Sequence, residues 1–185
     1  GFGRNNKYHK HLALEQFVHA IILTAGEGAR LGSWTANRPK GMIPIGNRPI
    51  LDYLVRGLVS SGIKKINMVV GYGKNSVMSY FGDGSNFGAN ISYFFQEERT
   101  GTLEAMRIGM SDDLNEFILV PGDNYVSSES FSRLRASTGL ALLSGKAERW
   151  SKWGEIELEK GKPRITFDSP EAYQRMHFTG IAKLD

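Results

Sequence analysis

The sequence lacks cysteine, long apolar runs and blocks of like charge, and each absence excludes a class of protein. Without cysteine there are no disulfides, zinc–thiolate sites or thiol nucleophiles, which is typical of a reducing cytoplasm, where we expect this protein to work. No stretch approaches the ~18 apolar residues of a membrane span, so we expect no membrane partner. The 23 Lys and Arg against 19 Asp and Glu leave a charge of +4, but the basic residues are scattered, which argues against nucleic-acid binding.

Glycine, in contrast, is abundant, with 22 among 185 residues against an average of ~7%. Tight backbone turns at a phosphate site would be one use for it. The length suits one domain with a full hydrophobic core. Residues 1–17 begin with glycine rather than methionine and contain no apolar segment of signal-peptide length. We interpret them as an N-terminal extension or an expression remnant, not as a targeting segment.

From residue 18 onward, strand signals alternate with helix signals. Apolar and β-branched runs predict strands at 18–26, 66–70, 90–95 and 117–120, and helical spacing predicts helices at 50–58, 74–81 and 102–110, the last with Thr102 as N-cap. This order predicts a mostly parallel sheet with helices on both faces. Ligands of such sheets bind at the carboxyl ends of the strands. The alternation fades between residues 132 and 153.

A glycine-rich loop follows the first predicted strand. It begins with Gly26 and Gly28 but has Leu31 where a dinucleotide-binding loop has its third glycine, and no Gly-Lys-Ser/Thr follows for a triphosphate loop of the Walker type. Arg30 and Lys40 lie in the same loop. Backbone N–H groups beside fixed positive charges suit a triphosphate that is attacked at its α-phosphorus. The alternative is a flexible basic surface loop.

Three segments resemble a known family, in the order that the family shows. They are LTAGEGARLGSWTANRPKGMIPIGNRPIL at 23–51, YFGDGSNFGANISYFFQEERTGTLEAM at 80–106 and LVPGDN at 119–124. The first resembles the opening signature of the nucleotidyltransferases that act on sugar 1-phosphates, such as glucose-1-phosphate thymidylyl- and uridylyltransferases. This resemblance implies a Rossmann-like three-layer α/β/α sandwich with a mixed, mostly parallel sheet, and a nucleotidyltransferase domain at 18–185.

The resemblance also implies a reaction and roles for individual residues. A sugar 1-phosphate would attack the α-phosphorus of a nucleoside triphosphate, with Mg²⁺ as cofactor, giving an NDP-sugar and pyrophosphate. The implied catalytic residues are Arg30 and Lys40, and the implied metal ligand is Asp123. The implied nucleotide contacts are Leu23, Ala25, Gly26, Gly28, Gln96, Gly101 and Thr102, and the implied sugar contacts are Gly154, Asp168 and Thr179. The Gln96 amide, with a donor and an acceptor, would read a pyrimidine base, which favours UTP or dTTP.

Departures from the family pattern leave alternatives open. Asp168-Ser169-Pro170 stands where the family has Glu-Lys-Pro, so the lysine that binds the sugar phosphate is missing. The sequence also ends before the family's second metal-binding acid, so we expect the domain to lack its C-terminal part. The alternatives are a diverged nucleotide-binding sensor or regulatory subunit, and a cytidylyltransferase that uses CTP with inositol or choline phosphate. Assembly as a homo-oligomer also stays open.

Overall fold

A computed structural model of the protein describes residues 18–98, 101–111, 114, 116–146, 155–159, 162–166 and 176–184. The strands are β1 (His19–Thr24), β2 (Pro44–Ile45), β3 (Arg48–Pro49), β4 (Lys65–Val70), β5 (Asn90–Phe95), β6 (Phe117–Pro121), β7 (Ala141–Lys146), β8 (Glu155–Glu159), β9 (Lys162–Thr166) and β10 (Met176–Leu184). The α-helices are α1 (Ile50–Ser60), α2 (Lys74–Phe81), α3 (Thr102–Gly109) and α4 (Ser128–Ala136). Short 3₁₀ turns occupy Ala29–Thr35, Lys40–Met42 and Ser85–Phe87.

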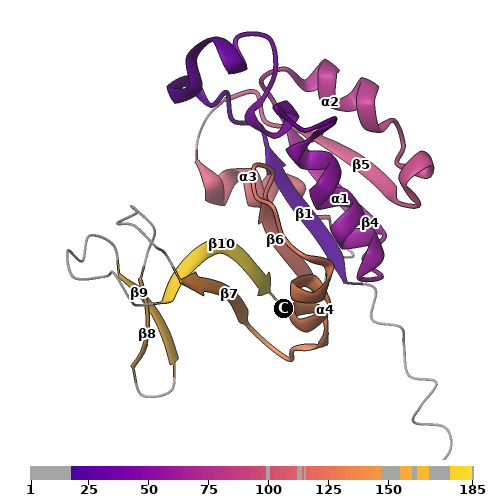
Figure 1. Ribbon diagram of the computed structural model, residues 1–185. Coiled ribbons are helices and arrows are strands. Elements are labelled where there is room, and N and C mark those ends of the chain that lie inside the picture. The colour runs from indigo at the N-terminus through magenta and orange to yellow at the C-terminus, as the bar shows by residue number, and fades with distance from the viewer. Residues whose placement is uncertain are drawn as a thin grey trace, which may run out of the picture.

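One mixed sheet forms the centre of the fold. Its strand order is β5-β4-β1-β6-β10-β8-β9, with β7 also paired to β10. The pairs β5–β4, β4–β1 and β1–β6 are parallel, whereas β10 pairs antiparallel with β6, β7 and β8. In register, Leu23 of β1 lies between Val69 of β4 and Pro121 of β6. The parallel strands therefore end together at one edge, and the antiparallel strands extend the sheet beyond β6 (Figure 1).

Helices cover both faces of the parallel strands. Alternate residues of β1 point to opposite faces, with Ile22 in a core beneath α1, α2 and α4, and Ile21 in a second core against α3. Leu54 and Leu58 bury the inner face of α1, as helical spacing predicts. The expected three-layer α/β fold is thus confirmed, and Figure 1 shows α1 and α3 on opposite sides of β1.

Two details differ from the sequence-based expectations. The N-cap of α3 is Gly101, at φ 102° and without a side-chain cap bond, and Thr102 is the first helical residue instead. Glycine takes this position because φ lies in the region that side chains disfavour. The weakly patterned stretch after residue 132 contains the end of α4 and the strand β7. Its pattern is faint because, among the residues of α4, Phe131 and Leu134 are the buried ones.

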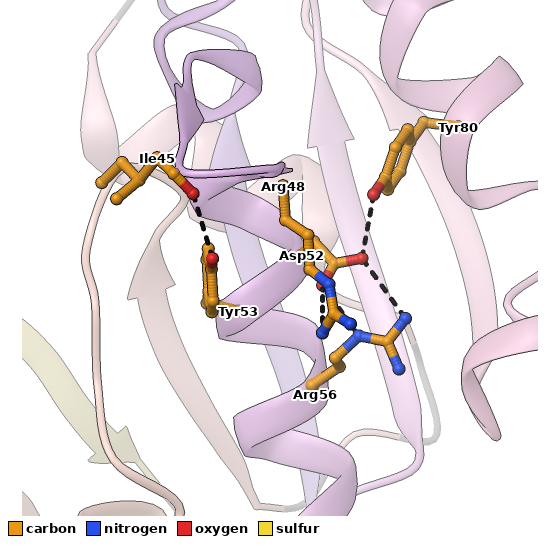
Figure 2. Close-up of polar contacts among 6 residues, drawn as sticks. All are labelled: Ile45, Arg48, Asp52, Tyr53, Arg56 and Tyr80. Atoms are coloured by element: carbon orange, nitrogen blue, oxygen red, sulfur yellow. Dashed lines mark hydrogen bonds and ion pairs between the residues drawn. The ribbon is translucent and has the colours of Figure 1, made fainter.

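A polar cluster on α1 joins this helix to its neighbours (Figure 2). The Asp52 side chain is 1% exposed, and Arg56 Nε donates to its Oδ1 at 2.7 Å. Tyr80 on α2 donates from its hydroxyl to Asp52 Oδ2 at 3.0 Å, and Arg48 Nη1 lies 3.9 Å from Oδ1. Tyr53 donates to Ile45 O at 3.0 Å. These contacts fix the β2–β3 hairpin and α2 to α1.

Candidate functional site

The carboxyl ends of β1 and β6 border a small cavity of about 120 Å³. We call it the β1–β6 cavity. Its lining consists of Leu23, Thr24, Gly26, Gly28, Lys40, Gly41, Gly122 and Asp123. Five of the predicted site residues, from three separate parts of the chain, therefore meet at the strand edge where parallel sheets bind ligands.

Lys40 and Asp123 form an ion pair across this cavity. Lys40 Nζ contacts Asp123 Oδ2, although 83 positions separate the two residues in the sequence. Their side chains are 45% and 29% exposed, so water screens the pair and its contribution to stability is below about 1 kcal/mol. The arrangement instead places one ammonium and one carboxylate within reach of the same ligand.

Two glycines, Gly41 and Gly122, allow the turn that carries Lys40 to pack closely against the ends of β6 and β1. A Cβ at Gly41 would lie 2.6 Å from Gly122 O, and one at Gly122 would lie 2.9 Å from Thr24 Cβ. Gly122 N donates to Leu23 O at 2.8 Å, which ties the turn after β6 to the end of β1. Larger residues at Gly41 or Gly122 would push the Lys40 turn away from β6.

The loop between β1 and Lys40 is internally braced. Gly28 has φ 68°, and a Cβ there would lie 3.2 Å from Lys40 Cβ. Thr35, which is 2% exposed, donates from Oγ1 to Gly28 O at 3.2 Å and is also 3.3 Å from Gly32 O. The backbone of Arg30 lies in the 3₁₀ turn of this loop, but its side chain is outside what the structure describes.

A second cavity, of about 380 Å³, adjoins the carboxyl ends of β1, β4 and β5. We call it the β4–β5 cavity. Its lining consists of Ala25, Val70, Gly71, Tyr72, Lys74, Phe95, Gln96 and Glu97. Because Ala25 and Gly26 are consecutive but belong to different linings, the two cavities are neighbours along the same edge of the sheet. Two predicted nucleotide contacts, Ala25 and Gln96, lie in this second one.

Gln96 joins the end of β5 to the start of α3. Its backbone N–H donates to Val70 O at 2.9 Å, and its side-chain Nε2 donates to Gly101 O at 3.3 Å. The structure thus brings Gln96 and Gly101 together, with Thr102 next in the chain. The amide of Gln96 has a second N–H and an oxygen for further partners.

Of the three predicted sugar contacts, the structure describes Thr179 alone. Thr179 lies on β10 beside the turn that carries Asp123, because Asn124 Nδ2 donates to Thr179 O at 3.0 Å. Its hydroxyl donates to Leu143 O at 2.8 Å. Gly154 and Asp168 lie outside the described residues, as does the N-terminal segment 1–17.

Sequence reasoning missed several residues of these linings, two of which, Thr24 and Tyr72, carry a hydroxyl group. Thr24 borders the β1–β6 cavity, and its buried Oγ1 has no hydrogen-bond partner among the described residues. Tyr72 borders the β4–β5 cavity and contacts the loop before Lys40. Their positions in the sequence could have indicated both residues, since Thr24 ends β1 and Tyr72 follows the end of β4, where parallel sheets bind ligands.

The described part of the chain contains no group of three or more His, Cys, Asp or Glu arranged to hold a metal ion. None of its helices has the length and apolarity needed to cross a membrane.

Two curated proteins are similar to this chain in sequence. A low-salt glycan biosynthesis nucleotidyltransferase from Haloferax volcanii is 32% identical over 68% of this chain and 37% of its own length. A UTP–glucose-1-phosphate uridylyltransferase from the same organism is 36% identical over 58% of this chain and 44% of its own. The chain therefore spans less than half the length of these relatives.

A solved structure supports the fold. The crystal structure of a UDP-glucose pyrophosphorylase complexed with UDP-glucose superimposes with a TM-score of 0.73, covering 91% of this chain and 76% of that one at 21% identity. The profile of the family described as nucleotidyl transferase matches residues 19–166, which include both cavities. The chain thus belongs to the nucleotidyl transferase family.

Proposed function

We propose that the protein transfers a nucleotidyl group from a nucleoside triphosphate to a sugar 1-phosphate, giving an NDP-sugar and pyrophosphate. The observation that carries this proposal is the meeting of Lys40 and Asp123 at one cavity, beside the backbone of Gly26 and Gly28. The relatives named for this chemistry on glucose 1-phosphate support the choice of reaction and of a hexose 1-phosphate as acceptor.

The two neighbouring cavities suit the two ends of a nucleotide. The base would occupy the β4–β5 cavity between Ala25 and Gln96, and the phosphates would lie in the β1–β6 cavity. Backbone N–H groups near Gly26 and Gly28 would bind phosphate oxygens, because no Cβ obstructs a close approach there. The Gln96 amide would pair with a base edge, which favours UTP or dTTP over a purine nucleotide.

Catalysis would consist of positioning and charge neutralisation. An oxygen of the sugar phosphate attacks the α-phosphorus in line, the bond from that phosphorus to the bridging oxygen breaks, and pyrophosphate leaves with the electron pair. Lys40 would leave its pair with Asp123 and face the phosphate oxygens, where its charge offsets the negative charge of the transition state. Arg30, from the same loop, would assist.

A magnesium ion fits the donor chemistry at the end of β6. Mg²⁺ prefers oxygen ligands and is commonly held by one or two carboxylates together with substrate phosphates and water. Asp123 supplies one such carboxylate, in the cavity proposed for the phosphates. When bound, the ion would neutralise phosphate charge.

A pyrophosphate-release assay tests the proposal directly. We would incubate the protein with Mg²⁺ and each of UTP, dTTP, CTP and ATP against a panel of sugar 1-phosphates, and include inositol and choline phosphates. We expect release with UTP or dTTP and a hexose 1-phosphate. Nucleotide binding without release from any pair would contradict the enzyme and support a nucleotide sensor, and release with choline or inositol phosphate alone would contradict the sugar acceptor.

A further inference from the structure

The turn between β4 and α2 lines the β4–β5 cavity and contacts the loop that leads to Lys40. Gly71 and Tyr72 line the β4–β5 cavity, and Tyr72 N donates to Ala25 O at 3.2 Å, so the backbone of this turn is fixed to the end of β1. A Cβ at Gly71 would lie 2.7 Å from Gln96 O. The turn is therefore packed tightly against the residues proposed to contact the base.

The side chain of Tyr72 reaches in the other direction, to the loop that precedes Lys40. Its hydroxyl is 2.9 Å from Thr35 O and also contacts Ala36 O, and its single proton can go to either carbonyl. Other backbone hydrogen bonds in this loop join near neighbours, such as Leu31 N to Gly28 O. The tyrosine thus supplies a long-range anchor, across 36 and 37 positions of sequence.

Thr35 connects the Tyr72 contact to Lys40 through Gly28. The buried Thr35 hydroxyl donates to Gly28 O, and the Gly28 backbone packs against the Lys40 side chain. A second contact acts at the other end of the loop, where a Cβ at Gly73 would lie 2.6 Å from Pro39 Cδ. Because Pro39 immediately precedes Lys40, the β4–α2 turn holds the lysine's loop at two points.

We infer that Tyr72 is a positioning residue, which borders the cavity for one end of the nucleotide and holds, through its hydroxyl, the loop that aims Lys40 at the other end. This inference rests on the proposed function. Tyr72 does not touch the reacting atoms. It acts by keeping Lys40 in place, and small displacements of a catalytic group cost large factors in rate.

The test is Tyr72→Phe, which keeps the ring in the cavity and removes only the hydroxyl. We expect kcat for pyrophosphate release to fall about tenfold or more, with the KM for the nucleoside triphosphate changed less than about twofold. Hydrogen exchange of peptides covering residues 28–42 should become faster. The control is Tyr93→Phe, which removes a similar hydroxyl bond, to Gly82 O at 2.6 Å, from a residue outside both cavity linings.

Each outcome decides the inference. Unchanged exchange in Tyr72→Phe would overturn it, as would a raised KM with unchanged kcat, because the residue would then act in binding alone. A similar loss of turnover in Tyr93→Phe would also overturn it. If the wild-type protein released no pyrophosphate with any pair, the proposed function would fail, and the exchange comparison alone would decide whether Tyr72 fixes the loop.

Discussion

At the scale of single residues, Lys40 and Asp123 account for most of the proposed chemistry. The two side chains form a partly exposed pair, so each can exchange its partner for a ligand at little cost in folding. Replacing either residue should therefore reduce catalytic activity without a matching loss of folding stability.

The variant Lys40→Ala should lose at least about a hundredfold in pyrophosphate release, because no other described side chain in the β1–β6 cavity carries a positive charge. Its thermal midpoint should stay close to that of the wild type. Lys64→Ala is a matched control, since Lys64 is an exposed lysine before the start of β4, at the opposite edge of the sheet. Equal turnover in Lys40→Ala and wild type would reject Lys40 as a catalytic residue.

The variant Asp123→Asn keeps an oxygen for Lys40 but removes the negative charge. We expect the Mg²⁺ concentration needed for half-maximal turnover to rise about tenfold or more, because carboxylates bind this ion far better than amides. A titration of turnover against Mg²⁺ measures the shift. A curve that coincides with that of the wild type would exclude Asp123 as the ligand.

At the scale of elements, the Asp52 cluster holds α1, α2 and the β2–β3 hairpin together. Burial, the hydrogen bond that Tyr80 donates to Asp52 and the charge of that carboxylate raise the pKa of Tyr80 above its usual value. The cluster lies directly after the turn that carries Lys40, and Ile50 N donates to Ile43 O at 3.1 Å. The cluster therefore stabilises the start of α1, to which the residue after the Lys40 turn is hydrogen-bonded.

Replacing Asp52 with alanine should lower the free energy of unfolding by about 1–3 kcal/mol, because Tyr80 and Arg56 lose a buried acceptor. Urea denaturation measures this loss. Glu104→Ala removes an exposed carboxylate that pairs with Arg107 at 3.4 Å on α3, and it should cost less than about 0.5 kcal/mol. Equal losses of unfolding free energy in the two variants would show that burial does not strengthen the contribution of Asp52 to stability.

The same cluster predicts a loss of stability in alkali. The folded state holds Tyr80 with a raised pKa, so its contribution is complete below the unfolded pKa of about 10 and declines as the pH rises through the folded value. The difference in unfolding free energy between the wild type and Tyr80→Phe should be constant between about pH 8 and 9 and shrink toward pH 11. A difference independent of pH over that range would contradict the shift.

At the scale of the whole molecule, β10 joins the antiparallel strands to the parallel ones. In the middle of β10, near the site, Gly180 packs against Pro121 at the end of β6. At its far end Lys183, which is 2% exposed, contacts Ser137 O and lies 3.3 Å from Glu116 Oε2. Lys183→Met should thus lower the thermal midpoint while kcat at a temperature well below it stays unchanged. Differential scanning calorimetry and the pyrophosphate assay measure the two, and a selective loss of kcat would contradict this separation.

The sequence was informative where structure is local. The limits of α2 and β5 match the predicted ones to the residue, since Gly73 and Gly82 flank α2 and the apolar run of β5 ends at Phe95. The strand edge that carries Lys40 and Asp123 followed from strand–helix alternation. The contact between Tyr72 and the Thr35 carbonyl did not, because a hydroxyl bond to a backbone atom leaves no side-chain pattern. The mixed sheet that the resemblance implied is present, but the positions of its antiparallel strands were not predicted, since their pairing depends on contacts distant in sequence.

The succession of Ala25 and Gly26, with one residue in each cavity lining, has a consequence for protein engineering. In the proposed function, the base and the phosphates occupy separate cavities whose linings share the single peptide unit between Ala25 and Gly26, directly after β1. Grafting the β5–α3 connection, with Gln96 and Gly101, from a relative with another base preference should change one cavity and leave the other untouched. Grafting the β4–α2 turn would disturb both, because Tyr72 lines the β4–β5 cavity and its hydroxyl contacts the loop that leads to Lys40.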